Sequence, residues 1–423
     1  MPVETKGLGA SLRARMRPIA YFEREAQPDP APEPLICPII SVDDHVFESA
    51  VTFAGRLPAK FVDAAPRIIR HAEGADAWLF EGCEPELILS SNSAISWRID
   101  HRDPGVVRVD DMRAGTYDAK ARIADMDREG IWASQLFPSV NFGFAGQRLT
   151  LRCDPEPGLA YMRAWNDWIH DEYATAYPER FIAAQLTYLP DVDLAAKEVR
   201  RNAERGFRSV LFSENPEKLG LPSIHSGYWD PFFEACQETE TVVLLHLGSS
   251  SDVILPSSDS PADVVEVSIR VNPILAVVDW MFSRVPLRFP KLSIHISEGG
   301  IDWVPLVHSY LRNQERQHPV KDWPVATPPS DVLFRNFYYA GLWDAVAWDW
   351  FAELAPDQVS VEVDYPHSDT TFPRSQSYFA NCLRNVSDDA FEKIMYKNAA
   401  RLFRHPLPAA GWLASCGDLT SRV

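Results

Sequence analysis

Several features that would place a chain in a known class are absent from this sequence of 423 residues. It contains no Gly-x-Gly-x-x-Gly and no Gly-x-x-x-x-Gly-Lys-Ser/Thr, which excludes the usual dinucleotide and triphosphate loops. It contains no Gly-x-Ser-x-Gly, which disfavours a serine hydrolase. None of its six cysteines belongs to a Cys-x-x-Cys pair. We therefore expect thiols in a reducing compartment, and no disulfide framework or zinc cluster.

Long apolar runs and clustered positive charge are also absent. No stretch approaches the ~20 apolar residues of a membrane span, and the N-terminus has no continuous apolar segment typical of a secretory signal. Lys and Arg number 41 against 59 Asp and Glu, which gives a net charge of −18. This balance argues against nucleic acid and anionic membranes as partners. We expect a cytoplasmic protein that acts on a small molecule.

The chain instead alternates short apolar runs with amphipathic stretches. The runs are nearly continuous in apolar character, which is typical of parallel strands covered on both faces, and the stretches between them have helical spacing. Eight such units predict the α/β class and a (β/α)8 TIM barrel, with a doubly wound open sheet as the alternative. The expected strands lie in 35–42, 133–140, 180–190, 206–214, 241–250, 292–300, 336–341 and 358–369.

The alternation also predicts how the chain is divided. Residues 1–36, which end in a Pro-rich and acidic stretch, are expected to form an extended leader to a barrel over 37–404. Residues 51–118 contain Gly, Pro and strand-like pieces, so we expect a β-rich insertion after the first barrel strand, on the face where barrel active sites lie. Residues 388–404 predict a closing helix, and 405–423 a C-terminal tail.

Ionisable side chains follow four of the predicted strands. Asp43 and His45 follow the first, His246 ends the fifth, Glu298 follows the sixth and Asp364 follows the eighth. Residues at i and i+2 of a strand share a face, so Asp43 and His45 should point the same way. In a barrel these side chains would meet at its mouth.

Each of these residues has a simpler explanation when taken alone. Asp43 and His45 fit a polar loop, His246 a hydrogen-bonded core histidine, and Asp364 and Glu298 the caps of a turn or helix. Their shared position at strand ends favours a site for one divalent metal ion, Zn, Fe(II) or Mn(II), held by imidazole and carboxylate. Asp44, Asp369 and His295 are expected to have structural or supporting roles.

Residues 38–404 resemble the amidohydrolase-related family of metal-dependent barrels. The landmarks include "ISVDDHVFE", "FPKLSIHISEGGIDWVP", "VEVDYPHSDTTFP" and "KNAARLF". The resembling branch includes aminocarboxymuconate-semialdehyde decarboxylase and the γ-resorcylate and 5-carboxyvanillate decarboxylases. The resemblance implies metal ligands at Asp43, His45, His246 and Asp364, and it implies a homodimer.

The sequence departs from the family pattern at two positions. An aspartate, Asp43, stands at the first ligand position, and Glu298 replaces the family's catalytic histidine after the sixth strand. These departures favour hydrolysis of an amide, ester, lactone or thioester, with Glu298 and Asp364 as the catalytic carboxylates. The alternative is non-oxidative decarboxylation of an aromatic or dienoic acid. A non-catalytic barrel used for binding is a third hypothesis.

A bulky organic substrate would need an apolar pocket with a few polar groups. Aromatic residues are frequent in the predicted insertion and near the strand ends. Some of them are expected to be ordinary core residues. The residues predicted to bind substrate are Trp97, Arg98, Phe142, Trp303 and His367.

Overall fold

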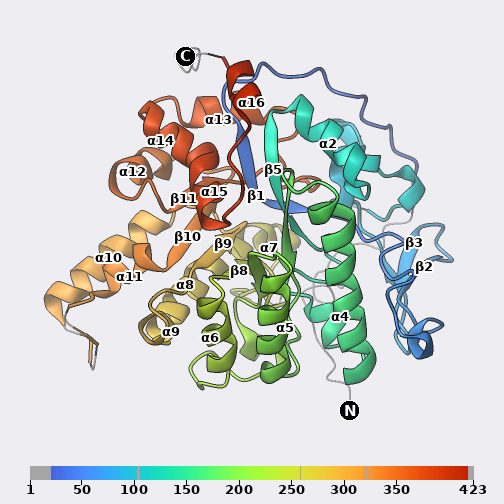
Figure 1. The fold of residues 1–423 in the computed structure, drawn as a ribbon, viewed down its shortest axis with the longest axis horizontal. Coiled ribbons are helices and arrows are strands. Elements are labelled where there is room, and N and C mark those ends of the chain that lie inside the picture. Colours follow the sequence, from blue (N-terminus) through green and yellow to red (C-terminus); the bar gives the residue numbers. More distant parts are fainter. Residues whose placement is uncertain are drawn as a thin grey trace.

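A computed structural model describes residues 21–101, 105–257, 259–318, 320–321, 323–324 and 326–417. Eight parallel strands pair in the order β1-β5-β6-β7-β8-β9-β10-β11, and helices lie between them around the sheet (Figure 1). The strands are β1 (Ile39–His45), β5 (Ile131–Phe137), β6 (Phe181–Gln185), β7 (Ser209–Phe212), β8 (Val242–His246), β9 (Ile294–Ser297), β10 (Phe337–Gly341) and β11 (Val359–Val361). The predicted (β/α)8 TIM barrel is confirmed.

The sheet is closed by contacts between its first strand and the segment that follows its last. The Asp364 amide donates a hydrogen bond to the Asp43 carbonyl oxygen at 2.9 Å, and the His45 amide donates to the Tyr365 carbonyl oxygen at 2.6 Å. The Val363 amide donates to Ser41 Oγ at 2.9 Å. Closure therefore brings the residues after β11 beside the C-terminal end of β1.

Some of the helices begin at a residue whose side chain caps the first turn. Asp118 and Asp191 accept hydrogen bonds from the amides of Ala121 and Leu194 at 2.7 and 2.9 Å. The α-helices are α2 (Ala119–Arg128), α3 (Gln147–Thr150), α4 (Pro155–Ile169), α5 (Val192–Glu204), α6 (Asp230–Glu238), α7 (Ala262–Ser268), α8 (Asn272–Phe282), α9 (Val285–Arg288), α10 (Val304–Gln317), α11 (Pro329–Arg335), α12 (Ala347–Leu354), α13 (Ser375–Cys382), α14 (Asp388–Glu392), α15 (Asn398–Leu402) and α16 (Ala410–Ser415). Two π-helical turns extend α4 and join α14 to α15, at His170–Thr175 and Lys393–Lys397.

A second, antiparallel sheet lies between β1 and α2. Its strands are β2 (Arg67–Arg70), β3 (Asp76–Leu79) and β4 (Glu86–Leu87), in the order β2-β3-β4. Figure 1 shows β2 and β3 outside the barrel strands, on the side of α4. Five 3-10 turns complete this part of the chain: Ala59–Phe61, Ser90–Ser96, Ile99–His101, Val109–Asp111 and Ala114–Thr116.

The predicted end of the first strand was wrong. This strand does not end before the polar residues but continues through Asp43 and His45, which are fully buried. The last strand ends at Val361, so Asp364 follows it as predicted. In the described part of the chain, no helix combines the length and apolar character needed to cross a membrane, and no disulfide is formed.

Candidate metal centre

Alternate side chains of strand β1 lie in different surroundings. Asp44 accepts a hydrogen bond from the Tyr365 amide at 2.9 Å and another from Ser134 Oγ on the neighbouring strand. Asp43 and His45 lie together on the other face, with His45 Nε2 at 3.2 Å from Asp43 Oδ1. As predicted, the side chains of Asp43 and His45 lie on the same face of the strand.

Asp43, His45 and His246 offer ligand atoms that lie within 4.8 Å of one another, and His45, Asp364 and His367 form a second such group that shares His45. His246 Nε2, at the end of β8, lies 3.2 Å from His45 Nε2 and 3.4 Å from Asp43 Oδ2. Asp364 Oδ1 lies 3.4 Å from His45 Nε2. All four predicted ligands are essentially inaccessible to solvent. The structure thus places the four residues predicted as metal ligands in two overlapping groups, and His367, which was predicted to bind substrate, belongs to the second group.

The two histidines are held in a defined orientation by backbone carbonyls. His45 Nδ1 lies 2.9 Å from the Pro138 carbonyl oxygen, and His246 Nδ1 lies 2.7 Å from the Leu247 carbonyl oxygen. A carbonyl only accepts, so each Nδ1 carries the proton and each Nε2 presents a lone pair. Two lone pairs facing each other at 3.2 Å require a positive group between them.

The carboxylates of the cluster have few partners. Neither oxygen of Asp43 accepts a hydrogen bond from any residue that the structure describes, and Asp364 Oδ1 lies 2.9 Å from His367 Nδ1. A buried carboxylate without a hydrogen bond or counter-ion is strongly unfavourable. Neutral imidazole and carboxylate donors at these positions fit a divalent cation such as Zn, Mn(II) or Fe(II).

Burial controls the protonation of these donors. It lowers the pKa of His246 to about 3, and it lowers the pKa of His45 well below the usual range. It raises the pKa of Asp43 and of Asp364 well above their usual range, and the nearby charge of Glu362 adds to the effect at Asp43. Neutral imidazole is the form that binds metals, whereas the carboxyls would lose protons when a cation binds.

Glu298 borders the cluster from the loop after β9. Its Oε2 lies 3.5 Å from His246 Nε2, and burial followed by the charge of Asp364 raises its pKa to about 8. Glu298 and Asp364 both adopt left-handed backbone conformations, with φ of +52° and +55°. Such conformations are unfavourable for residues with side chains and are concentrated at functional sites.

Two further charged residues next to Glu298 were not identified from the sequence. Glu362 is buried, and its Oε2 accepts a hydrogen bond from the Glu298 amide at 3.0 Å. Arg270 Nη1 donates to the Glu298 carbonyl oxygen at 3.1 Å and lies 3.8 Å from Glu298 Oε1. Glu362 could have been found, because it precedes Asp364 by two residues. Nothing in the local sequence distinguishes Arg270, which also pairs with Asp369.

A cavity of about 420 Å³ adjoins this group, which provides space for a small organic molecule. Arg270 and Glu362 form part of its wall, and Trp303 and Trp343 supply aromatic surface. The structure therefore places Trp303, one of the residues predicted to bind substrate, in the wall of a cavity that Arg270 and Glu362 also line, whereas none of the four predicted ligands lines it.

The other predicted substrate-binding residues lie in different surroundings. His367 stacks on His45 with ring centroids 3.8 Å apart, and its Nδ1 lies 2.9 Å from Asp364 Oδ1. Phe142 packs in an aromatic group with Trp78, Trp97 is buried beneath Arg24, and Arg98 is exposed and paired with Asp100. Phe144 instead covers the site, since its ring centroid lies 4.0 Å from that of His246.

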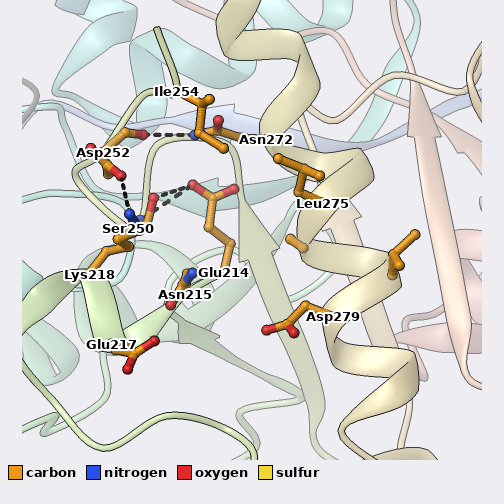
Figure 2. A pocket seen from close by; sticks show the side chains of 12 residues that line it. Glu214, Asn215, Glu217, Lys218, Ser250, Asp252, Ile254, Asn272, Leu275 and Asp279 are labelled. Atoms are coloured by element: carbon orange, nitrogen blue, oxygen red, sulfur yellow. Dashed lines mark hydrogen bonds and ion pairs between the residues drawn. The ribbon is translucent and has the colours of Figure 1, made fainter. Parts of the chain in front are cut away.

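The loop that follows His246 is held by a buried glutamate. Glu214, after β7, accepts hydrogen bonds from the Gly248 amide at 3.2 Å and from Ser250 Oγ at 2.7 Å. Figure 2 shows the Glu214 carboxylate directed at Ser250, in the wall of a separate cavity of about 440 Å³. Glu214 thus connects the ends of β7 and β8 and supports the position of His246.

Comparison with protein families gives one match, to the family described as amidohydrolase, over residues 108–405. No curated protein matches the chain. Among solved structures, the chain is similar to an amidohydrolase from Mycobacterium avium subsp. paratuberculosis K-10, with 22% identity and a TM-score of 0.66 over 87% of this chain and 100% of that chain.

Two solved decarboxylases are also similar. A dihydroxybenzoic acid decarboxylase from Polaromonas sp. JS666, with bound manganese and the inhibitor 2-nitroresorcinol, has 18% identity and a TM-score of 0.59 over 89% of this chain and 99% of that chain. A 5-carboxyvanillate decarboxylase from Novosphingobium aromaticivorans DSM 12444, in complex with manganese, has 16% identity and a TM-score of 0.57 over 91% of this chain and 100% of that chain. At these identities the similarity establishes a common fold.

Proposed function

Because the chain belongs to the amidohydrolase family, we propose that it is a metal-dependent enzyme that releases CO2 from an aromatic or dienoic acid without an oxidant. The two decarboxylases with a similar fold support this choice of reaction, and both were solved with manganese. Decarboxylation was the alternative at the level of sequence, where hydrolysis was favoured. Arg270, which was not identified from the sequence, favours decarboxylation over hydrolysis.

The observation that carries the proposal is a cation beside the partly buried carboxyl of Glu298. Arg270 Nη1 lies 3.8 Å from Glu298 Oε1, and Arg270 also lines the cavity of about 420 Å³. An anionic substrate needs positive charge near an otherwise acidic site, and a guanidinium binds a carboxylate through two parallel hydrogen bonds. Hydrolysis was favoured at the level of sequence by the acidic residues Asp43 and Glu298, and Arg270 offsets part of their charge.

Asp43, His45, His246 and Asp364 would hold the cation, which when bound stabilises negative charge on substrate oxygens. Arg270 would orient the substrate carboxylate, while Trp303 packs against the ring. As the bond between the ring carbon and CO2 breaks, its electron pair stays on the carbon. Glu298 Oε2 would give its proton to that carbon and then regain one from water.

Hydrolysis of an amide, ester, lactone or thioester is the second candidate. Hydrolysis is favoured by three neighbouring carboxyl groups, those of Asp364, Glu298 and Glu362. Together they could orient or deprotonate a water molecule. In that case Glu298 would accept a proton instead of donating one. The two candidates use the same side chains and differ in the bond that breaks.

The test compares two substrate panels on the manganese-loaded protein. One contains hydroxybenzoic acids and dienoic acids in D2O, and the other contains aryl amides, esters, lactones and thioesters. We expect CO2 release and one deuterium on the carbon that carried the carboxylate. We expect Glu298→Gln to lower this rate by about 10²-fold or more with manganese still bound, because the amide has no proton to donate.

Glu353→Gln, an exposed glutamate on α12, is the matched control and should leave the rate unchanged. Turnover of the second panel alone would replace decarboxylation with hydrolysis. Absence of turnover in both panels would favour a non-catalytic barrel. The homodimer and the cytoplasmic location expected from the sequence stay predictions, which light scattering of the purified protein and cell fractionation can test.

A further inference from the structure

A cavity of about 380 Å³ lies at the opposite end of the barrel from the metal centre. It is formed by the first residues of β6, the residues that precede β7 and the chain that follows α15. The metal centre lies at the C-terminal ends of the strands, so the two sites are separated by the length of the barrel. We propose that this cavity, called here the N-terminal cavity, binds a small organic anion with a flat apolar body, such as an aryl carboxylate.

The side chains around the N-terminal cavity differ in charge from the rest of the molecule. The whole chain has a net charge of −18. The cavity wall nevertheless contains no Asp or Glu among the residues that the structure describes, and it contains three arginines and two histidines. These are His170, Arg205, Arg208, Arg404 and His405. Cations gathered around one concave surface attract and retain an anion.

Two of the three arginines are already paired. Arg404 Nη1 lies 2.6 Å from Glu240 Oε2, and Arg205 Nη1 lies 2.8 Å from Asp167 Oδ1. Arg208 differs, because its guanidinium forms no hydrogen bond or ion pair with any described residue. Burial and the neighbouring charge of Arg404 lower the pKa of Arg208. The charge of Glu240, which pairs with Arg404, acts in the opposite direction, and an anion in the cavity would add a direct partner to the Arg208 guanidinium.

The backbone of Arg208 is nevertheless fixed. Its carbonyl oxygen accepts a hydrogen bond from the Val242 amide at 2.9 Å, directly before β7 and β8 pair along their length. The backbone that carries the guanidinium is therefore rigid, whereas ligand binding must still offset the entropy of ordering the Arg208 side chain.

The floor of the cavity is apolar and selects against a simple inorganic anion. Phe181 and Ile182 from β6 and Phe403 after α15 are buried beneath it. Phe207 also lines it and stacks with His170, with ring centroids 5.6 Å apart and an interplanar angle of 24°. A flat ring can lie on this floor while its carboxylate reaches Arg208. The volume is that of an ordinary small-molecule site.

The test uses a readout that identifies the site, because an aryl carboxylate can also enter the metal centre. The full-length, manganese-loaded protein is treated with phenylglyoxal, and arginine modification is located by peptide mass spectrometry. We expect 2-naphthoate to slow modification of Arg208 at least about tenfold, as expected for a charge-assisted contact. The neutral 2-naphthamide, and inorganic phosphate at the same concentration, should give little protection.

Calorimetry on variants provides the second measurement. Arg208→Gln should remove one 2-naphthoate binding event per chain and leave the binding event at the metal centre. Arg200→Gln is the matched control, because Arg200 is an exposed α5 arginine paired with Glu238 outside the cavity. Unchanged modification of Arg208, or equal protection by the amide or by phosphate, would overturn the proposal. Retained stoichiometry in Arg208→Gln would also overturn it.

Discussion

At the scale of single residues, buried carboxyl groups are the most informative feature of this chain. Asp43 accepts no hydrogen bond through its carboxylate oxygens within the described residues, and Asp364 Oδ1 lies close only to histidine rings among the contacts described above, so both are candidate ligands of a cation. Glu129 is equally buried, but its carboxylate accepts hydrogen bonds from the amide of Ser375, at 3.2 Å, and from the Ser375 hydroxyl. Burial alone therefore does not distinguish a ligand from a structural acid, whereas hydrogen-bond partners do.

Glu129 should make the stability of the protein depend on pH. Burial raises its pKa from 4.5 to about 8, so the folded protein favours the protonated carboxyl. Its contribution to stability is full below pH 4.5 and is lost as pH rises toward 8. Urea unfolding at pH 5 and pH 8 should show a difference in the free energy of unfolding that Glu129→Gln reduces by ~1–3 kcal/mol.

The matched control for that measurement is Glu353→Gln, which alters an exposed carboxyl and should keep the wild-type difference. Identical pH dependence in the Glu129→Gln variant and the wild type would show that Glu129 ionises without cost to the fold. In that case another buried acid, such as Glu48 or Glu214, would have to carry the effect.

The residues beside the metal centre were only partly predictable. Asp43, His45, His246 and Asp364 follow apolar runs that can be recognised as strands, and topology then brings them together. Arg270 lies in 3-10 turn η8 (Ile269–Val271), between two helices, and reaches Glu298 only because of how that long connection folds. A contact of this kind has no local pattern in the sequence.

At the scale of elements, the eight strands were predictable because each is a short, continuous apolar run. The ends of the strands were less predictable. Polar residues usually mark the end of a strand, but at the mouth of a barrel they can lie within the strand itself. β1 continues through Asp43 and His45 for this reason. The helices follow from capping residues as much as from apolar spacing, as α5 illustrates.

The cap of α5 offers a test at this scale. Asp191 accepts a hydrogen bond from the Leu194 amide at 2.9 Å, and α5 packs beside α6 in the outer layer of the barrel. Asp191→Ala leaves that amide without its partner and should lower the free energy of unfolding by ~1 kcal/mol. Denaturant unfolding measures this loss.

Lys197→Ala, on the exposed face of the same helix, is the control and should change stability by less than ~0.5 kcal/mol. Equal effects of the two substitutions would mean that the hydrogen bond to Asp191 adds nothing to the stability of α5.

At the scale of the whole molecule, the metal centre joins distant parts of the barrel, so its occupancy should affect global stability. A ligand that binds only the folded protein stabilises it by ~2.7 kcal/mol at a hundredfold excess over Kd. Removal of metal with a chelator should therefore lower Tm by several degrees, and addition of manganese should restore it. Elemental analysis should give about one ion per chain before removal.

His45→Ala should abolish both the bound metal and the shift in Tm, because it removes the donor nearest to Asp43, His246 and Asp364. His225→Ala, at an exposed histidine paired with Asp279, should preserve both. If the Tm of the wild-type protein were the same with and without metal, this cluster would be stable without a cation.

Closure of the barrel at Asp43 and Asp364 also affects when, relative to translation, a metal ion could bind. Asp43 is translated long before Asp364, yet the backbones of the two residues are hydrogen-bonded to each other. A nascent chain whose last barrel strand is still inside the ribosome lacks Asp364 and the backbone contact that Asp364 makes with Asp43. If the cluster holds a metal ion, we expect that ion to bind after the barrel is complete.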